Sequence, residues 1–294
     1  MLTLELERHR ERPFLCLDED SDHPAPCLSF GELLTAVERL RQRWAGLSRR
    51  SVALRLPWPP PAATIAALLA LADLEADAFL VDTELPEDLV RDLLLRHDVD
   101  DLVDDELRVL PLLGAGAHRP QDVTPRVTLL TCGASGTPKA VEHTWRSLTA
   151  GIPVQERLLQ SRWLLTDSLS RYGGLQVLLT CLLNGAELVV PQQVTATSVL
   201  DTCRRQAVSH AYGTPSFWRD LLASTSPQAR SELRLRQITL GGEIVDQPLL
   251  EALSESFPEA HITHSFARSE SGNAEESAPS LDIDPALDRA RAIA

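Results

Sequence analysis

The sequence predicts an α/β fold in which mainly parallel sheets are flanked by helices and packed as two subdomains. Short apolar runs that suit strands alternate with longer runs that suit helices, and this alternation is typical of parallel sheets. The chain has 294 residues, 44% of them hydrophobic, which is enough to bury a sizeable core. We expect subdomains at residues 1–125 and 126–273, followed by a disordered tail at residues 274–294.

The first subdomain begins with a capped helix. Ser29 and Glu32 have the spacing of a capping box, and apolar residues follow them with helical periodicity. A proline-rich run at residues 57–61 ends one strand and opens the next helix, because proline suits the first helical turn. The other elements expected here are strands at residues 51–56, 78–82 and 99–103 and helices at residues 62–75 and 87–96.

The second subdomain continues the alternation after a linker at residues 114–125, which contains Gly and Pro without periodicity. An apolar run at residues 127–130 predicts a strand, and a helix is expected at residues 143–152. Further strands are expected at residues 187–190, 236–240 and 261–266, with helices at residues 217–223 and 248–257. The tail has few large apolar residues, which predicts poor order.

Composition excludes several classes of partner. The net charge of −14 argues against a nucleic-acid or anionic-membrane surface, since both need clustered cations. The longest apolar run, residues 62–72, is too short to span a bilayer, and the first residues lack the apolar core of a signal peptide. No C-x-x-C pair or histidine metal motif occurs, so we expect buried free thiols in a reducing cytoplasm. The five cysteines are Cys16, Cys27, Cys132, Cys181 and Cys203.

One cation differs from all the others. Of the 28 lysine and arginine residues only Lys139 is lysine, and a compact ammonium suits a phosphate as a point charge. It closes a loop whose glycines let backbone amides approach an anion and whose hydroxyls add donors. The loop residues are Thr131, Gly133, Ser135, Gly136 and Thr137. Pro138 before the lysine and Ala140 after it exclude a Walker A motif. The loop indicates a phosphate site, with a surface turn in a lysine-poor sequence as the alternative.

Residues 131–140 read T-C-G-A-S-G-T-P-K-A. This stretch resembles the T-S-G-T-T-G-x-P-K-G signature of the AMP-forming, carboxylate-activating superfamily, which holds acyl-CoA synthetases, aryl-acid ligases, luciferases and nonribosomal adenylation domains. Further segments resemble that superfamily in the same order, at residues 62–82, 172–189, 212–216, 240–243 and 265–272. The resemblance covers the chain to about residue 273 and implies the large N-terminal part of that fold.

The resemblance implies a nucleotide site for ATP. The phosphates would lie on the loop at residues 131–139, with Lys139 as a catalytic cation. Gly241, Gly242 and Glu243 would line the adenine slot, where glycine lets backbone pack against a flat ring. Taken alone, the two glycines fit a tight turn equally well.

The last matched segment implies the remaining catalytic groups. Ser269 would contact the α-phosphate, and Glu270 would hold Mg²⁺, a hard cation that prefers carboxylate oxygens. Phe266 and Ala267 stand where the family's Y-G-x-T-E-x-G motif has Tyr and Gly, so the aromatic hydroxyl of that part of the nucleotide site is lost. Taken alone, Glu270 also fits a solvated loop acid.

The resemblance also implies a pocket for the acid substrate at Arg171, Tyr172, Gly173 and Gly174. Tyr172 falls where amino-acid-activating domains keep an Asp for the α-ammonium group, which favours an acyl or aryl acid over an α-amino acid. Arg171 falls near the family's common pocket His, with a surface arginine as the alternative.

We therefore expect an enzyme that converts a carboxylic acid and ATP to acyl-AMP and later transfers the acyl group to a CoA or carrier-protein thiol. Family members continue with a lid domain that carries a catalytic lysine, and these 294 residues hold no second lysine. A separately encoded lid protein or self-association would then cover the exposed surface. The rival hypothesis is a degenerate, non-catalytic subunit that binds a nucleotide or acyl group, favoured by Cys132, Ala134, Ala140 and Ala267. A third interpretation is a fragment of a longer protein.

Overall fold

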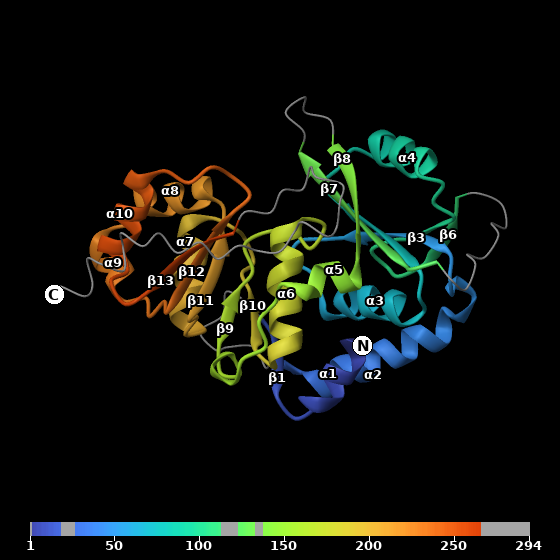
Figure 1. The fold of residues 1–294 in the computed structure, drawn as a ribbon, viewed down its shortest axis with the longest axis horizontal. Coiled ribbons are helices and arrows are strands. Elements are labelled where there is room, and N and C mark those ends of the chain that lie inside the picture. Colours follow the sequence, from blue (N-terminus) through green and yellow to red (C-terminus); the bar gives the residue numbers. More distant parts are fainter. Residues whose placement is uncertain (1, 19–26, 113–122, 133–137, 266–294) are drawn as a thin grey trace.

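The computed structural model describes residues 2–18, 27–112, 123–132 and 138–265. Two sheets with helices on their faces make up the described part of the chain (Figure 1). The seven-stranded sheet has the order β13-β12-β11-β9-β10-β1-β2, and the six-stranded sheet has the order β6-β5-β3-β4-β7-β8. The predicted α/β fold with mainly parallel sheets is confirmed.

In the seven-stranded sheet every pair of neighbouring strands is parallel except β1 and β2. Its strands are β1 (Pro13–Leu17), β2 (Leu28–Ser29), β9 (Arg162–Leu164), β10 (Glu187–Val190), β11 (His210–Gly213), β12 (Gln237–Gly241) and β13 (His261–Ser265). Side chains alternate between its two faces, since Leu188 and Val190 join one apolar cluster with α6 (Tyr172–Asn184), and Val189 joins another with α7 (Ala196–Arg205).

The six-stranded sheet has a parallel centre and antiparallel edges at β6 and β8. Its strands are β3 (Ser51–Leu56), β4 (Asp77–Asp82), β5 (Asp101–Val103), β6 (Val109–Pro111), β7 (Arg126–Cys132) and β8 (Pro138–Thr144). Val52 and Leu54 pack toward α3 (Ala62–Asp73), whereas Ala53 packs toward α4 (Glu87–Arg96) on the opposite face. Helices on both faces explain why the central strands β3 and β4 are mostly apolar.

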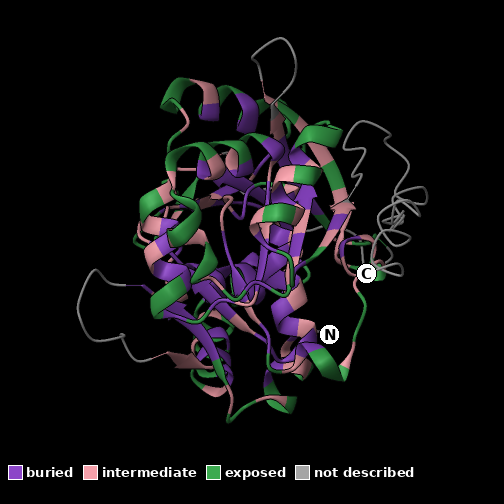
Figure 2. Cartoon of the chain, turned by 90° about the vertical axis from the view of Figure 1, so that its left-hand side faces the viewer, coloured by how far each residue is buried: buried purple, intermediate pink, exposed green. Residues whose placement is uncertain are grey.

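One apolar cluster joins the two sheets. It draws on β1, β10 and α6 beside the seven-stranded sheet and on α3, β4 and β7 of the other. Buried residues accordingly follow the strands and the inner sides of the helices in Figure 2. The remaining helices are α1 (Leu2–Arg8), α2 (Phe30–Arg43), α5 (Trp145–Ala150), α8 (Pro215–Ser224), α9 (Pro227–Ser231) and α10 (Gln247–Ser256), with 3₁₀ turns at Ala45–Leu47 and Glu156–Leu158.

The capping box at the start of α2 forms as predicted. The Ser29 hydroxyl accepts from the Glu32 backbone amide, and the Glu32 carboxylate accepts from the Ser29 amide at 2.8 Å. The helix predicted at residues 143–152 is wrong at its start, because β8 runs to Thr144 and pairs antiparallel with β7. The helix α5 begins only at Trp145, where the Thr144 hydroxyl accepts from the Ser147 amide at 3.0 Å.

Each of the two sheets contains strands from before and after residue 125. The N-terminal strands β1 and β2 belong to the seven-stranded sheet, while β7 and β8, after that residue, complete the six-stranded sheet. The expected boundary at residues 125–126 therefore does not coincide with a boundary between the sheets. The tail at residues 274–294 and most of the linker at residues 114–125 lie outside the described residues.

The expectation of free thiols is wrong for two of the five cysteines. Cys16 and Cys27 form a disulfide that ties β1 to the residue before β2. These residues are 11 apart in sequence and belong to no motif, so only the antiparallel pairing of the two strands brings them together. Cys181 and Cys203 are buried free thiols as expected. In the described part of the chain, no helix combines the length and apolarity needed to cross a membrane.

Candidate nucleotide and acid site

Several of the predicted site segments follow the carboxyl ends of neighbouring strands in the seven-stranded sheet. Arg171 and the start of α6 come after β9, Gly213 ends β11, and the Gly241–Gly242 pair ends β12. Because β9, β11 and β12 are parallel, their carboxyl ends lie at one edge of the sheet, which is where α/β sheets bind ligands. We call this the site edge.

The ring of Tyr212, in β11, lies where the predicted acid pocket meets the predicted adenine slot. A Cβ atom at Gly173 would lie 2.3 Å from Tyr212 Cε1, and one at Gly241 would lie 2.6 Å from the Tyr212 hydroxyl oxygen. Neither position accepts a side chain while the ring is there, so both glycines are required by close approach. The structure therefore brings Gly173 and Gly241 together around one aromatic ring.

Gly174 has a different role from its neighbour. A Cβ atom there would lie 2.3 Å from the Ser168 carbonyl oxygen, so this glycine lets α6 pack against the loop that precedes it. Gly242 has a φ of 80°, which favours glycine, and its nearest neighbour would be Thr214 Cγ2 at 3.6 Å. A side chain at Gly242 would thus meet ordinary van der Waals contacts, so the positive φ is what favours glycine there.

Glu243 directs its carboxylate at the next helix. One carboxylate oxygen accepts from the Ser216 amide at 2.9 Å and from the Ser216 hydroxyl at 2.7 Å. These donors belong to the first turn of α8, where an anion is favoured by the helix dipole. At the predicted adenine slot, the Glu243 side chain is therefore engaged by α8.

Arg171 lies beside a half-buried carboxyl group, that of Asp167, which the sequence did not single out. Its Nε atom is 3.5 Å from Asp167 Oδ1, and the Ser168 amide donates to the same oxygen at 2.9 Å. Burial raises the pKa of Asp167 to about 6, an effect that the positive charge of Arg171 opposes. The negative charge of Asp82, at the end of β4, raises the same pKa and shows that the six-stranded sheet also reaches the site edge.

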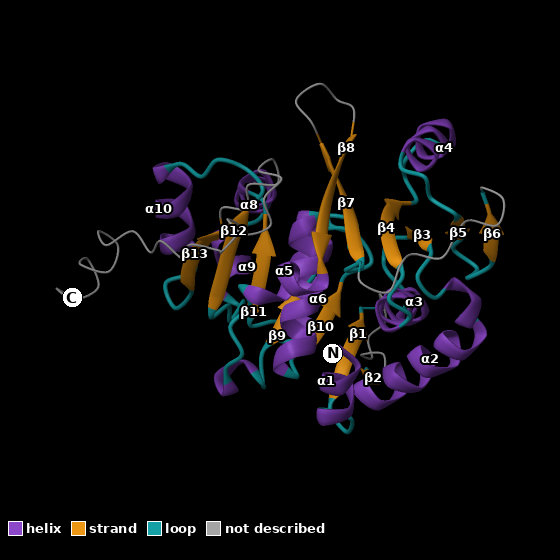
Figure 3. Cartoon of the chain, turned by 45° about the vertical axis from the view of Figure 1, so that its right-hand side comes forward, coloured by secondary structure: helices purple, strands orange, loops and turns teal. Residues whose placement is uncertain are grey.

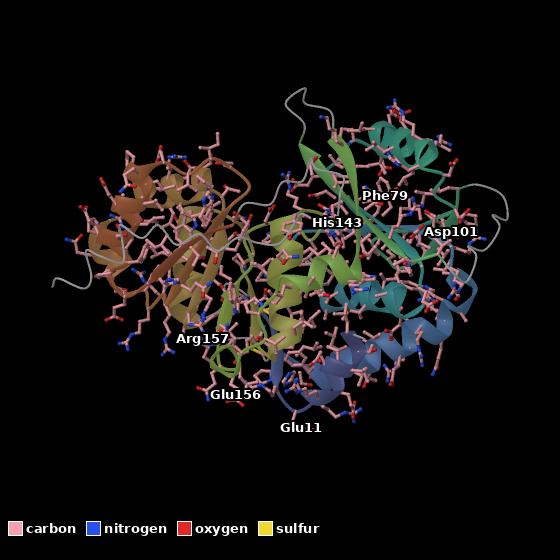
Figure 4. The ribbon with its side chains drawn as sticks, viewed as in Figure 1. Glu11, Phe79, Asp101, His143, Glu156 and Arg157 are labelled. Atoms are coloured by element: carbon pink, nitrogen blue, oxygen red, sulfur yellow. A yellow bond between two sulfur atoms is a disulfide. The ribbon has the colours of Figure 1, made fainter. Side chains whose placement is uncertain are left out.

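Tyr172 links the two sheets at the site edge. Its ring centroid lies 5.7 Å from that of His143 in β8, which Figure 4 labels near the start of α6. Burial raises the pKa of the Tyr172 hydroxyl and lowers the pKa of His143, so both groups are neutral at pH 7. Tyr172 thus presents a neutral, aromatic side chain at the predicted acid pocket.

Lys139 lies on the hairpin that β7 and β8 form (Figure 3). It pairs with Thr131 across the hairpin, and the Thr131 hydroxyl donates to the Lys139 carbonyl oxygen at 3.4 Å. The Lys139 residue is exposed. The two ends of the predicted phosphate loop are therefore held in register by the ladder, with the ammonium free to meet a ligand from solvent.

Several predicted residues lie outside the described ranges: Gly133, Ser135, Gly136, Thr137, Phe266, Ala267, Ser269 and Glu270. Their roles stay predictions. Within the described ranges, one group of three side chains has metal-ligand spacing, namely Cys16, Cys27 and Glu187. Its two sulfur atoms are bonded to each other, and Arg162 Nε lies 2.7 Å from Glu187. That group does not suit Mg²⁺, which takes oxygen ligands.

Comparison with known proteins identifies the class that this fold and site define. A sequence model of the family described as AMP-binding enzyme matches residues 61–274. The chain belongs to this family. It is 28% identical over 245 residues to 2-succinylbenzoate–CoA ligase of Escherichia coli (strain K12), covering 78% of this chain and 52% of that protein. It is 27% identical over 189 residues to tyrocidine synthase 3 of Brevibacillus parabrevis, covering 60% of this chain and 3% of that protein.

Solved structures share the fold. IdnL1 matches with a TM-score of 0.74 at 20% identity, over 92% of this chain and 60% of that one. O-succinylbenzoate coenzyme A synthetase from Bacillus subtilis, in complex with AMP, matches with a TM-score of 0.69 at 22% identity, over 92% of this chain and 74% of that one. The chain spans about half the length of the Escherichia coli relative, 52%.

Three residues of the site edge were not predicted to have a role. Asp167 lies five positions before Tyr172 in a loop without a motif, and nothing local predicts its raised pKa. His143 was placed in a helix, whereas its position in β8 brings it to Tyr172. Tyr212 lies inside the matched segment at residues 212–216 but was given no role of its own. The glycines at positions 173 and 241 are the signal that could have identified it, because both pack against its ring.

Proposed function

We propose that this chain activates a carboxylic acid with ATP, forming acyl-AMP and pyrophosphate, as part of an AMP-forming ligase. The observation that carries the proposal is the convergence of family-matched segments at the site edge. The start of α6, the end of β11 and the end of β12 meet around Tyr212, although they lie far apart in the sequence. Membership of the AMP-binding enzyme family supports this interpretation.

Each side chain has a task in the proposed reaction. Lys139 and the loop from Thr131 hold phosphate oxygens, and the Gly241–Gly242 backbone borders the adenine. Ser269 contacts the α-phosphate, and Glu270 binds Mg²⁺. The bound Mg²⁺ would screen the negative charges that meet when the acid's carboxylate approaches the α-phosphorus. Catalysis by these residues is then mostly positioning and electrostatic stabilisation.

The acid pocket favours an acyl or aryl acid without an α-ammonium group. Tyr172, a half-buried and neutral aromatic residue, occupies the position from which a carboxylate would pair with that ammonium. The half-buried carboxyl group of Asp167 faces Arg171 and has a pKa raised to about 6 by desolvation, so it is a poor partner for a second cation.

We further propose a thiol of CoA or of a carrier protein as the final acceptor. The relatives include a CoA ligase and a tyrocidine synthase, which motivates both choices. Lys139 is the only lysine of the 294 residues, so a lid lysine must be supplied by another polypeptide or polypeptide segment. ATP and CoA are cytoplasmic metabolites, and the proposal places the reaction there.

Acid-dependent exchange of pyrophosphate into ATP tests the proposal, with short-chain, fatty, aryl and amino acids assayed in turn. We expect exchange with at least one acyl or aryl acid and its loss in Lys139→Ala. Arg146→Ala, which removes an exposed cation from the neighbouring helix α5, is the matched control and should retain exchange. Binding of AMP without exchange for any acid, with the lysine-bearing lid polypeptide also present, would contradict the enzyme and favour the non-catalytic, nucleotide-binding alternative.

A further inference from the structure

Three side chains of the seven-stranded sheet have the chemistry and the spacing of metal ligands. They are Cys16 in β1, Cys27 immediately before β2, and Glu187 at the start of β10. One ligand atom of each lies within 4.8 Å of the other two, and among the described residues no other group of three reaches this spacing. The proposed reaction makes no use of this group.

The strand pairing places these side chains together. Cys16 pairs with Val189 in the parallel ladder of β1 and β10, and Glu187 lies two positions before Val189. Side chains two positions apart share a face of the sheet, so Cys16 and Glu187 point to the same side. The antiparallel pairing of β1 with β2 brings Cys27 to Cys16, to which it is bonded. The backbone hydrogen bonds of the sheet thus hold the three segments in position.

Sulfur and carboxylate lie at the separation that one zinc ion requires. Cys16 Sγ is 3.7 Å from Glu187 Oε2. Two tetrahedral ligands, a sulfur about 2.3 Å and a carboxylate oxygen about 2.1 Å from Zn²⁺, are about 3.6 Å apart. Thiolate ligands favour Zn²⁺ over Mg²⁺ or Ca²⁺, which take oxygen ligands. Three protein ligands leave a fourth position for water.

Charge and access also suit a divalent cation. Arg162 Nε lies 2.7 Å from Glu187 Oε2, where it would orient the carboxylate, and Arg162 Nη2 lies 3.6 Å from Cys16 Sγ. Two thiolates, the Glu187 carboxylate and this guanidinium carry three negative charges and one positive charge, so a divalent cation neutralises the group. Cys16 is buried, whereas Cys27 and Glu187 are half-buried and give the ion a path from solvent.

We propose that Cys16, Cys27 and Glu187 bind Zn²⁺ when the disulfide is reduced. A dithiol reductant transfers two electrons and two protons, so the sulfur–sulfur bond breaks, Cys16 and Cys27 become thiols, and the reductant leaves as its own disulfide. Zn²⁺ then displaces the two thiol protons and binds both sulfurs and one Glu187 oxygen. The start of β2 is thus tied to β1 by a covalent bond in oxidising conditions and by a metal ion in reducing ones. The reducing cytoplasm, in which the proposed reaction is placed, favours the zinc form.

Titration of the full chain with Zn²⁺ in two redox states tests the proposal without any variant. One sample keeps the disulfide, and the other is reduced with dithiothreitol, which is removed under nitrogen before the titration. A chromophoric chelator competes for the ion and reports the affinity. The reduced chain should bind a single Zn²⁺ at least about 100-fold more tightly than the disulfide form, because the thiolates supply most of the affinity of such a site. Equal affinities, or no binding to the reduced chain, would overturn the proposal.

Cobalt in place of zinc identifies the ligands, since charge transfer from thiolate to cobalt gives a near-ultraviolet absorption band. The reduced chain should show this band, and the double variant Cys16→Ser, Cys27→Ser should lose it. Cys203→Ala is the matched control and should keep the band, because Cys203 is a buried free thiol outside the group. Glu187→Gln should keep the band and weaken Zn²⁺ binding about tenfold or more. A band that survives in the double variant, or an unchanged affinity in Glu187→Gln, would contradict the assignment.

Thermal stability gives an independent readout. Because the ion binds the folded chain, excess Zn²⁺ should raise the Tm of the reduced chain and leave that of the disulfide form unchanged. An unchanged Tm in the reduced chain would overturn the site. None of these measurements uses ATP or an acid, so failure of the zinc site and failure of the proposed function are distinguishable. Each variant is compared with the unchanged chain only after its far-ultraviolet circular dichroism is shown to match.

Discussion

The β7–β8 hairpin and the site edge contribute to the same proposed reaction in opposite ways. The hairpin presents an exposed cation, Lys139, on an antiparallel edge strand of the six-stranded sheet. The site edge presents half-buried groups, Tyr172 and Asp167, and two glycines at which a Cβ atom would overlap the Tyr212 ring. The exposed region can be changed with little effect on folding, whereas the packed region couples every change in chemistry to stability.

The contrast indicates a division of tasks. Phosphates carry the same charge in every substrate of this class, so a mobile point charge is sufficient to bind them. The acid varies from enzyme to enzyme, and its discrimination needs a rigid wall. Selectivity is therefore expected where the backbone packs most closely, at residues such as Gly173 and Gly241.

The largest effect is expected for Lys139→Ala. Loss of the phosphate-binding cation should lower acid-dependent pyrophosphate exchange by about 100-fold or more, in the range found for removing one preorganised electrostatic group. The urea midpoint should remain unchanged, because the side chain is exposed. A clear fall in that midpoint would contradict the view that the hairpin is independent of folding.

Gly173→Ala should chiefly affect stability. The added Cβ would lie 2.3 Å from Tyr212 Cε1, and such overpacking typically costs about 1–3 kcal/mol in the free energy of unfolding. Urea denaturation of Gly173→Ala, Tyr212→Ala and the double variant forms a cycle. The double variant should recover most of the loss caused by Gly173→Ala, and additive losses would mean that the two positions do not contact each other.

Asp167→Asn should change the pH dependence of stability. Burial raises the pKa of Asp167 in the folded protein to about 6, above its ordinary value of 3.8, so the folded state binds more protons between these values. The stability contributed by this group is complete at low pH and falls as the pH rises through the interval from about 4 to 6. Asparagine removes that fall, and at pH 7 the variant should be about 1 kcal/mol more stable, less than the full shift because it loses the contact with Arg171.

Urea midpoints of both proteins at pH 4.5 and pH 7 check this prediction. Other groups titrate equally in the two proteins, so the difference between them isolates Asp167. An identical pH dependence in both would show that Asp167 is ionised normally in the folded state.

The smallest effect is expected for Glu243→Ala. Its carboxylate accepts from the first turn of α8, and such a contact at a helix N-terminus is typically worth about 0.5 kcal/mol. AMP affinity should be unaffected, because only the backbone of this turn would border the adenine. Calorimetric titration with AMP checks this point, and a loss of affinity greater than threefold, about 0.6 kcal/mol, would assign the side chain to the nucleotide.

The fold was predictable because strand and helix alternate locally, and propensity and capping act over a few residues. Ser29 and Glu32 show this, since their capping box forms as expected. The β8 strand was not predictable from residues 138–144, because its partner β7 supplies the hydrogen bonds that stabilise it. The disulfide between Cys16 and Cys27 likewise depends on strand pairing that no short motif records.

The site was predictable only in part, because it too depends on contacts between segments that are distant in the sequence. Motifs identified Gly173 and Gly241 separately, and each is compatible with an ordinary turn. Both glycines contact Tyr212, so residues 173, 212 and 241 meet although they are about 30 to 40 residues apart in sequence. Only the parallel order of β9, β11 and β12 places them together. Burial, which determines the pKa of Asp167, is likewise a property of the assembled sheets.

Lys139 is the only lysine among the 294 residues, and this has a practical consequence for chemical labelling. Amine-reactive esters have only this exposed side chain and the N-terminal amine as targets among the 294 residues. Arginine does not react with such esters, so one acylated side chain per molecule would sit at the end of the phosphate loop. The extent of acylation with and without ATP, read by peptide mass after tryptic cleavage at the arginines, would then test whether ATP shields that amine as proposed.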